Sequence, residues 1–146
     1  MHWHEEVLNK PKLRTYVLFK NEVDVEQYVK QHMHKRIRSR FAQFRLGILP
    51  LHIETGRYVN TPVVDRKCKL CELDHIEDEY HFLMICPFYN DFRLTMFFKA
   101  SQIISNFATR NNDDKFVILV KTCQKYVAQF IDSSFEKRRN FIYKHL

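Results

Sequence analysis

Residues 68–86 read CKLCELDHIEDEYHFLMIC, and they hold three of the four cysteines in a chain of 146 residues. Only two residues separate Cys68 from Cys71, so one tight turn can bring both thiolates to adjacent corners of a tetrahedral metal site. His81 and Cys86 complete the spacing Cys-x2-Cys-x9-His-x4-Cys. Sulfur and imidazole ligands favour Zn²⁺ over Mg²⁺ or Ca²⁺, which prefer oxygen. The spacing therefore predicts a zinc site whose ligands are Cys68, Cys71, His81 and Cys86.

Two other interpretations of the ligand set stay open. His75 is a rival ligand, although only three residues lie between it and Cys71, a short span for the chain to reverse. The three cysteines could instead be buried thiols in an ordinary core. Their neighbours count against a core position, because they are charged: Arg66, Lys67, Lys69, Glu72 and Asp74.

The acidic run Glu77, Asp78 and Glu79 precedes the apolar residues 82–84. Acidic side chains suit the first turn of a helix, where they meet the positive end of the helix dipole. They could alternatively bind a catalytic metal, but no lysine-and-acid set follows to complete a nuclease site. Four protein ligands also fill a tetrahedral site, and a closed site of this kind has a structural role. We therefore expect no enzymatic activity.

Glycine is scarce, and its scarcity limits the fold class. The chain has two glycines, Gly47 and Gly56, against roughly ten at average usage. Neither a Rossmann fingerprint nor a P-loop can be formed from two glycines at this spacing. Few glycines and prolines also count against a turn-rich sandwich or barrel. The sequence predicts a mostly α fold, a small helical domain with an embedded CCHC zinc module made of a short turn plus a helix.

Apolar residues at three- and four-residue spacing predict three long helices. The expected helices cover about 25–46, 89–107 and 114–143, with a loop of extended pieces over 48–62. The first of them is either one helix or a pair of helices broken near residues 32–34. Asp24 is the expected N-cap of the first helix and Gly47 its C-terminal stop, whereas the polar run 109–114 should cap the last helix. Cys123 falls on the apolar stripe of that last helix, which predicts a core position. The expected segments, within one compact domain, are an N-terminal segment (1–24), a basic helical region and loop (25–64), the CCHC zinc module (65–93) and C-terminal helices (94–146).

The charge balance points to a polyanionic partner. The chain has 24 Lys and Arg against 17 Asp and Glu, a formal charge of +7, which suits nucleic acid or an acidic membrane surface. Residues 27–53 contain six Lys or Arg and no acid. Such a surface either binds phosphates by Coulomb attraction and counterion release or is merely solvated. The candidates for nucleic-acid contacts are Lys35, Arg36, Arg38, Arg40, Arg45, Arg57, Arg66, Lys67 and Lys69. Tyr58 and Tyr89 are either stacking platforms for unpaired bases or packing residues.

The compartment is expected to be intracellular, nuclear or cytoplasmic. No run of eighteen apolar residues exists, and the N-terminus lacks the apolar segment of a secretory signal. In reducing compartments cysteines serve as metal ligands or core residues more often than as disulfides. The basic residues 35–40 also fit a weak nuclear localisation pattern.

A series of short motifs resembles a known family. The motifs are Gly56-Arg-Tyr58, Arg66-x-Cys68-x2-Cys71, Ile76-Glu-Asp-Glu-x-His-Phe-Leu83, Cys86-Pro-x-Tyr89 and Arg93, with Leu13-Arg-Thr-Tyr16, Phe41-x-x-Phe-Arg45 and Ile53-Glu-Thr-Gly56 upstream. Together they resemble the C-terminal CCHC zinc-binding tail of non-LTR retrotransposon reverse transcriptases, over about residues 12–93. The resemblance implies a domain that helps bind template RNA or target DNA. The chain lacks a Tyr-x-Asp-Asp motif, so it resembles a tail detached from the polymerase.

Two functions from different classes follow from the sequence. The first is a non-catalytic, zinc-stabilised module that binds RNA or DNA, with no membrane partner. The alternative is a helical protein-interaction or structural domain, in which the basic helix docks on an acidic protein and zinc only stabilises the fold.

Overall fold

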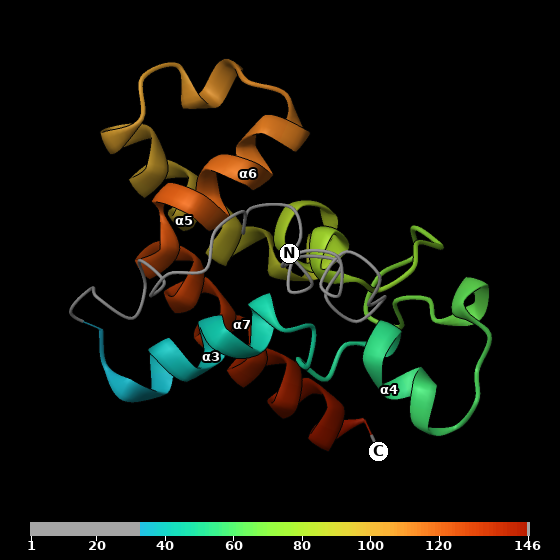
Figure 1. The fold of residues 1–146 in the computed structure, drawn as a ribbon. Helices are drawn as coiled ribbons and strands as arrows, with labels where there is room; N and C mark the ends of the chain where they lie inside the picture. Colours follow the sequence, from blue (N-terminus) through green and yellow to red (C-terminus); the bar gives the residue numbers. More distant parts are fainter. Residues whose placement is uncertain (1–32, 146) are drawn as a thin grey trace, which may run out of the picture. The chain divides into compact units, whose positions relative to one another are not determined.

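The computed structural model describes residues 33–145 and is mostly helical, as the sequence predicts (Figure 1). Its α-helices are α3 (Lys35–Arg45), α4 (His52–Tyr58), α5 (Asn90–Ile103), α6 (Asn112–Thr122) and α7 (Gln124–Lys144). Between them lie the 3-10 turns η3 (Val63–Asp65), η5 (Pro87–Tyr89) and η6 (Phe107–Thr109), and the π-helical turn η4 (His81–Ile85). Residues 33–145 contain no strand, only one antiparallel bridge between Lys67 and Ile76. The expected N-cap Asp24 and residues 25–32 lie outside the described residues.

The chain divides into two compact units, and the division differs from the four segments expected from the sequence. We call residues 42–88 the cysteine unit, and residues 33–41 together with 89–145 the helical unit. The boundary falls inside α3, between Phe41 and Ala42. Within the described part of the chain, no helix is both long and apolar enough to cross a bilayer.

The cysteine unit contains a helix where the sequence predicted a loop, and this prediction was wrong. The helix, α4, buries Ile53, Glu54 and Gly56. The helix has too few apolar residues for helical periodicity to be visible in the sequence. Its packing depends instead on a close contact at Gly56. A Cβ added to Gly56 would lie 2.7 Å from Cγ of Arg66, so no larger residue fits there. Gly47, in contrast, ends α3 as predicted, with φ of 69°.

The helical unit is built on the packing of α5 and α6 against α7. Its buried residues include Met96 and Ala100 from α5, Leu119 from α6, and Val127 and Ile131 from α7. These residues keep three- and four-residue spacings, so the apolar pattern correctly located the faces that form the core.

Two helix boundaries differ from the prediction. The helix expected over 89–107 ends at Ile103, and the helix expected over 114–143 is two helices separated at Cys123. Cys123 is only 3% exposed, which confirms its core position. The spacing of apolar residues continues through Cys123, so periodicity alone could not reveal the break. The predicted cap is confirmed, because the Asn111 side chain accepts a hydrogen bond from the Asp114 amide at 2.8 Å.

Candidate metal centre

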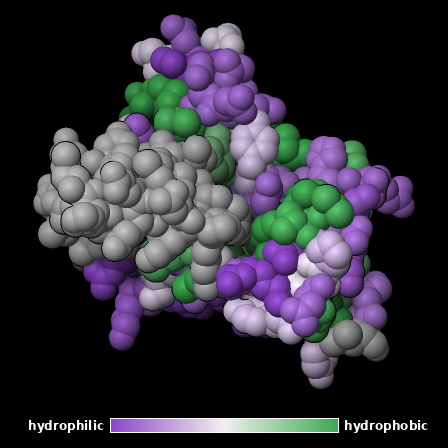
Figure 2. Space-filling model, turned by 45° about the vertical axis from the view of Figure 1, so that its right-hand side comes forward, coloured by the Kyte–Doolittle hydropathy of each residue, from purple (hydrophilic) through white to green (hydrophobic). Residues whose placement is uncertain are grey.

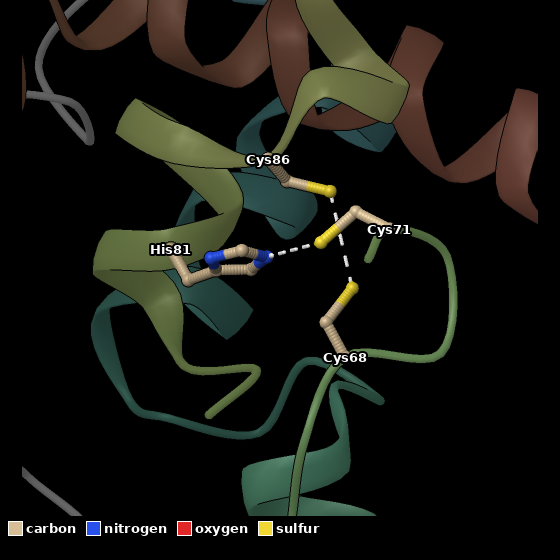
Figure 3. A group of neighbouring side chains, drawn as sticks. All are labelled: Cys68, Cys71, His81 and Cys86. Atoms are coloured by element: carbon tan, nitrogen blue, oxygen red, sulfur yellow. Dashed lines mark hydrogen bonds between the residues drawn. The ribbon is translucent and has the colours of Figure 1, made fainter. Parts of the chain in front are cut away.

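The four predicted ligands come together in the cysteine unit. Their ligand atoms all lie within 4.8 Å of one another. Figure 3 shows the side chains pointing toward a common centre, with Cys68 and Cys71 on a loop, His81 on the helical turn η4 and Cys86 at its end. Such a group can hold a metal ion.

The separations fit one tetrahedral ion. Sγ of Cys68 lies 3.9 Å from Sγ of Cys86, and Sγ of Cys71 lies 3.5 Å from Nε2 of His81. Bonds of about 2.3 Å to sulfur and about 2.0 Å to nitrogen, at tetrahedral angles, place two sulfurs about 3.8 Å apart and a sulfur and a nitrogen about 3.5 Å apart. These two separations match those values, so both pairs already lie at the spacing that an ion of that size requires.

A short reversal of the chain positions Cys68 and Cys71. The amide of Cys68 donates to the carbonyl of His75 at 2.9 Å, and the amide of Glu77 donates to the carbonyl of Arg66 at 2.9 Å. Asp74 sits at the tip with φ of 60°. Within the turn, the amide of Leu70 donates to Sγ of Cys68 at 3.4 Å. This last bond would stabilise a thiolate at Cys68, because a negative sulfur is the better acceptor.

The π-helical turn positions the other two ligands. The amide of Cys86 donates to the carbonyl of His81 at 2.8 Å, five residues back. In an α-helix, side chains five residues apart point about 140° away from each other around the helix axis, so the side chains of His81 and Cys86 would lie on different faces. The wider π turn brings them onto one side. Asp78 caps this segment, since its Oδ1 accepts the His81 amide at 2.8 Å, as expected for the acidic run.

The ligands are mostly buried, and their pKa values differ. Cys86 is fully buried and His81 is 3% exposed. The hydrogen bond to Cys86, together with burial, raises the pKa of Cys68 to about 12. The same bond lowers the pKa of Cys86, whereas burial raises the pKa of Cys71. Without an ion, Cys68 and Cys71 therefore keep their protons near neutral pH, and a metal ion must displace both.

Glu77 links the cysteine loop to α4. Its carboxylate is 2% exposed, and Oε1 accepts the amide of His52 at 2.7 Å. Its other oxygen, Oε2, lies 3.6 Å from Sγ of Cys68. Arg66 strengthens the same connection, because its guanidinium donates to the carbonyls of Thr61 and Ile53 at 2.9 and 3.0 Å. The sequence predicted neither role, since Arg66 was a candidate for nucleic-acid contacts and Glu77 belonged to the acidic run expected at a helix start.

His75 is not one of the four converging side chains. It is exposed, and its ring packs edge-on against the ring of His81 with centroids 5.4 Å apart. The structure therefore favours His81 over His75 as the fourth ligand, in agreement with the order of preference from the sequence.

The predicted nucleic-acid contacts are spread over both units and are not equivalent. Arg45 is a correction, because its side chain is only 2% exposed and cannot reach a phosphate. Tyr89 is 1% exposed, which excludes stacking on a base, whereas Tyr58 is 74% exposed. Four of the other cations have carboxylate partners: Arg36 and Arg40 with Asp132 at 2.6 and 4.0 Å, Arg57 with Glu54 at 3.1 Å and Lys67 with Asp74 at 2.8 Å. Lys35 and Lys69 are exposed, and Arg38 is half-buried.

Among the described residues, the net positive charge lies in the helical unit. Its described residues contain fourteen Lys and Arg against five Asp and Glu, whereas the described residues of the cysteine unit contain five against seven. The unit with the metal centre is therefore slightly acidic, which its sequence motifs did not suggest. A charge count over the expected zinc module, residues 65–93, already gives four Lys or Arg against seven Asp or Glu. The tertiary structure adds that residues 33–41 join residues 89–145 in one unit.

Comparisons with protein-family models, with curated proteins and with solved structures find no match for this chain. The resemblance to retrotransposon reverse transcriptase tails therefore stays a prediction that rests on the motifs alone.

Proposed function

We propose that this chain is a non-catalytic nucleic-acid-binding module in which a structural zinc ion stabilises the cysteine unit and the helical unit binds phosphates. The observation that carries the proposal is the concentration of positive charge in the helical unit, fourteen cations against five acids in its described residues. Surfaces of this kind bind nucleic acid through counterion release, with strong salt dependence and little sequence preference.

Zinc is the ion that we propose for the metal centre. Three cysteines and one histidine form a ligand set typical of structural zinc, and the measured separations suit its bond lengths. Four protein ligands leave no open position for a catalytic water. The ion would hold together a unit with a small apolar core, in which zinc binding supplies part of the folding free energy.

Helix α3 offers the sharpest test of the phosphate-binding surface. Lys35 and Arg38 lie one helical turn apart on α3 and have no carboxylate partner among residues 33–145. Arg36 and Arg40 are less suitable, because both approach Asp132 and their replacement would disturb the packing on α7. The matched control is Lys69, an exposed cation of the slightly acidic cysteine unit.

The experiment measures fluorescence anisotropy with single-stranded RNA and DNA at low salt and at about 0.2 M salt. We expect the double variant Lys35→Glu and Arg38→Glu to weaken binding and to lower the salt slope by about 2, roughly 1 for each lost phosphate contact. Lys69→Glu should change little. An absence of binding at low salt, or equal effects of the two variants, would contradict the proposal.

One observation favours the alternative, a protein-interaction domain. Hydrophobic side chains form patches on the surface in Figure 2. In the cysteine unit, the segment that follows α4 is unusually exposed, with Val59 at 73% and Val64 at 67%. Contiguous patches of exposed apolar side chains often mark protein-binding surfaces. Co-purification of an acidic protein in place of nucleic acid would support this alternative.

A further inference from the structure

A pocket of about 100 Å³ lies between α5 and α7 in the helical unit. No metal ligand lines it. One face of α5 and one face of α7 form its walls, since the side chains that line it recur at three- and four-residue spacing on each helix. The residues that matter for its chemistry are Phe92, Thr95 and Lys99 on α5, and Tyr126, Gln129 and Ser133 on α7.

Two of the three aromatic rings that line the pocket, those of Tyr126 and Phe92, have an ammonium group beside them. Nζ of Lys99 lies 5.6 Å from the centroid of the Tyr126 ring and donates to Oε1 of Gln129 at 3.2 Å. Nζ of Lys137, one turn beyond Ser133 on α7, lies 6.0 Å from the centroid of the Phe92 ring. These are distances at which a cation and a ring attract each other. Positive charge is therefore held next to both rings.

We propose that this pocket binds one unpaired base of a single-stranded nucleic acid, with phosphates of the same strand beside Lys99 and Lys137. The inference rests on the proposed nucleic-acid binding and adds to it a site that reads a base and not only the backbone. Bases stack on aromatic side chains, whereas neighbouring cations attract the phosphates that flank the base.

Size and polarity favour a single base over other occupants. A volume of about 100 Å³ is well below the roughly 300–1,000 Å³ of common small-molecule pockets, so one planar ring fits better than a whole cofactor. Thr95, Gln129 and Ser133 carry groups that can hydrogen-bond to the polar edge of a base. An apolar side chain of a protein partner would make no hydrogen bond with these groups, whereas the polar edge of a base can.

The test uses the full chain and two short oligothymidylates of equal length, one intact and one in which the bases are replaced by abasic sites. Both carry the same phosphates, so the difference in affinity measures the contribution of the bases. We expect Tyr126→Ala to weaken binding of the intact strand roughly 5- to 150-fold and to leave binding of the abasic strand unchanged.

Two controls separate stacking from other effects. Tyr126→Phe keeps the ring and should bind as the unaltered protein does. Tyr143→Ala removes a tyrosine from the same helix that is 83% exposed and does not line the pocket, so it should also have no effect. Equal weakening by Tyr143→Ala and Tyr126→Ala would overturn the proposal.

The comparison of the two strands on the unaltered protein needs no variant and therefore does not depend on how variants fold. Equal affinity for the intact and the abasic strand would overturn the base pocket but leave phosphate binding intact. Binding of neither strand at low salt would overturn the base pocket and the proposed function together. Displacement of the intact strand by polyglutamate of equal charge, at equal concentration, would mean that charge alone explains the binding, and this too would overturn the base pocket.

Discussion

Sγ of Cys68 lies 3.9 Å from Sγ of Cys86, although the two residues are 18 positions apart in the chain. The chain reversal at residues 68–75 and the π-helical turn at His81–Ile85 together produce this approach. The hydrogen bond between these two sulfurs raises the pKa of Cys68 and lowers that of Cys86. A metal ion at this position would replace the hydrogen bond with two metal–sulfur bonds.

Replacement of a ligand should remove the metal. We expect one zinc ion per chain in the unaltered protein and less than a tenth of that in Cys86→Ser, since loss of one of four ligands opens the site. Elemental analysis of the purified protein measures the zinc content. Cys123→Ser is the matched control, because Cys123 is also a buried free cysteine but belongs to the helical core. Equal zinc content in the two variants would contradict the assignment.

Metal affinity should depend steeply on pH. Near neutral pH, Cys68 and Cys71 hold protons in the metal-free protein, because their pKa values are raised. Binding must release at least these two protons, so affinity should fall by about 100-fold for each unit of decrease in pH. Competition with a chromophoric chelator at about pH 6.5 and pH 7.5, corrected for protonation of the chelator, measures the change. A corrected affinity that does not vary with pH would exclude thiol ligands.

The same pKa shift predicts how the metal-free protein responds to alkaline pH. The raised pKa of Cys68 in the folded state means that its contribution to stability is complete below the unfolded value of about 8.5. The contribution is lost as the pH rises toward the folded pKa of about 12. The melting temperature of the metal-free protein should therefore fall above about pH 9, whereas that of the zinc-bound protein, whose thiolates are already deprotonated, should fall less.

Removal of the Asp78 cap should weaken the metal centre selectively. The carboxylate of Asp78 accepts the amide of His81, so Asp78→Ala should cost about 1 kcal/mol of stability and also lower zinc affinity. Asn111→Ala removes a comparable cap from α6, with a similar loss of stability and no change in zinc affinity. Thermal melts and chelator competition on both variants measure the two effects. Equal zinc affinities would mean that the Asp78 cap does not position His81.

Gly56→Ala should destabilise the cysteine unit. The added methyl group would lie 2.7 Å from Cγ and 2.9 Å from Cδ of Arg66, which donates to the carbonyls of Thr61 and Ile53. Displacement of this side chain should cost about 1–3 kcal/mol, as overpacking does elsewhere. A thermal melt measures the loss. The double variant Gly56→Ala and Arg66→Ala should recover part of the lost stability, because the clash is then absent. If no stability is recovered, the strain lies in the backbone of α4 and not in the contact with Arg66.

The ligand set and two helix ends were predictable from the sequence, because they depend on short-range geometry. The two-residue gap between Cys68 and Cys71 limits how far their thiols can separate, so the pair was recognisable without a fold. Gly47 and Asn111 act on the backbone within a few residues. Gly47 was predicted as a helix stop, and Asn111 lies in the polar run 109–114 that was predicted to cap the last helix. The apolar spacing likewise located the helix faces that form the core, since burial follows the 3.6-residue period.

Other properties depended on the tertiary structure alone. Arg45 and Tyr89 were candidates for surface contacts, yet both are buried, because exposure depends on which segments pack over a side chain and not on its type. The π turn that aligns His81 with Cys86 leaves no mark in the spacing of apolar residues. The basic residues 33–41 join residues 89–145 for the same reason, since only folding brings these distant segments into one unit. By itself the sequence determined which atoms can bind a metal and where the charges lie along the chain, whereas the fold decided which cations stay exposed.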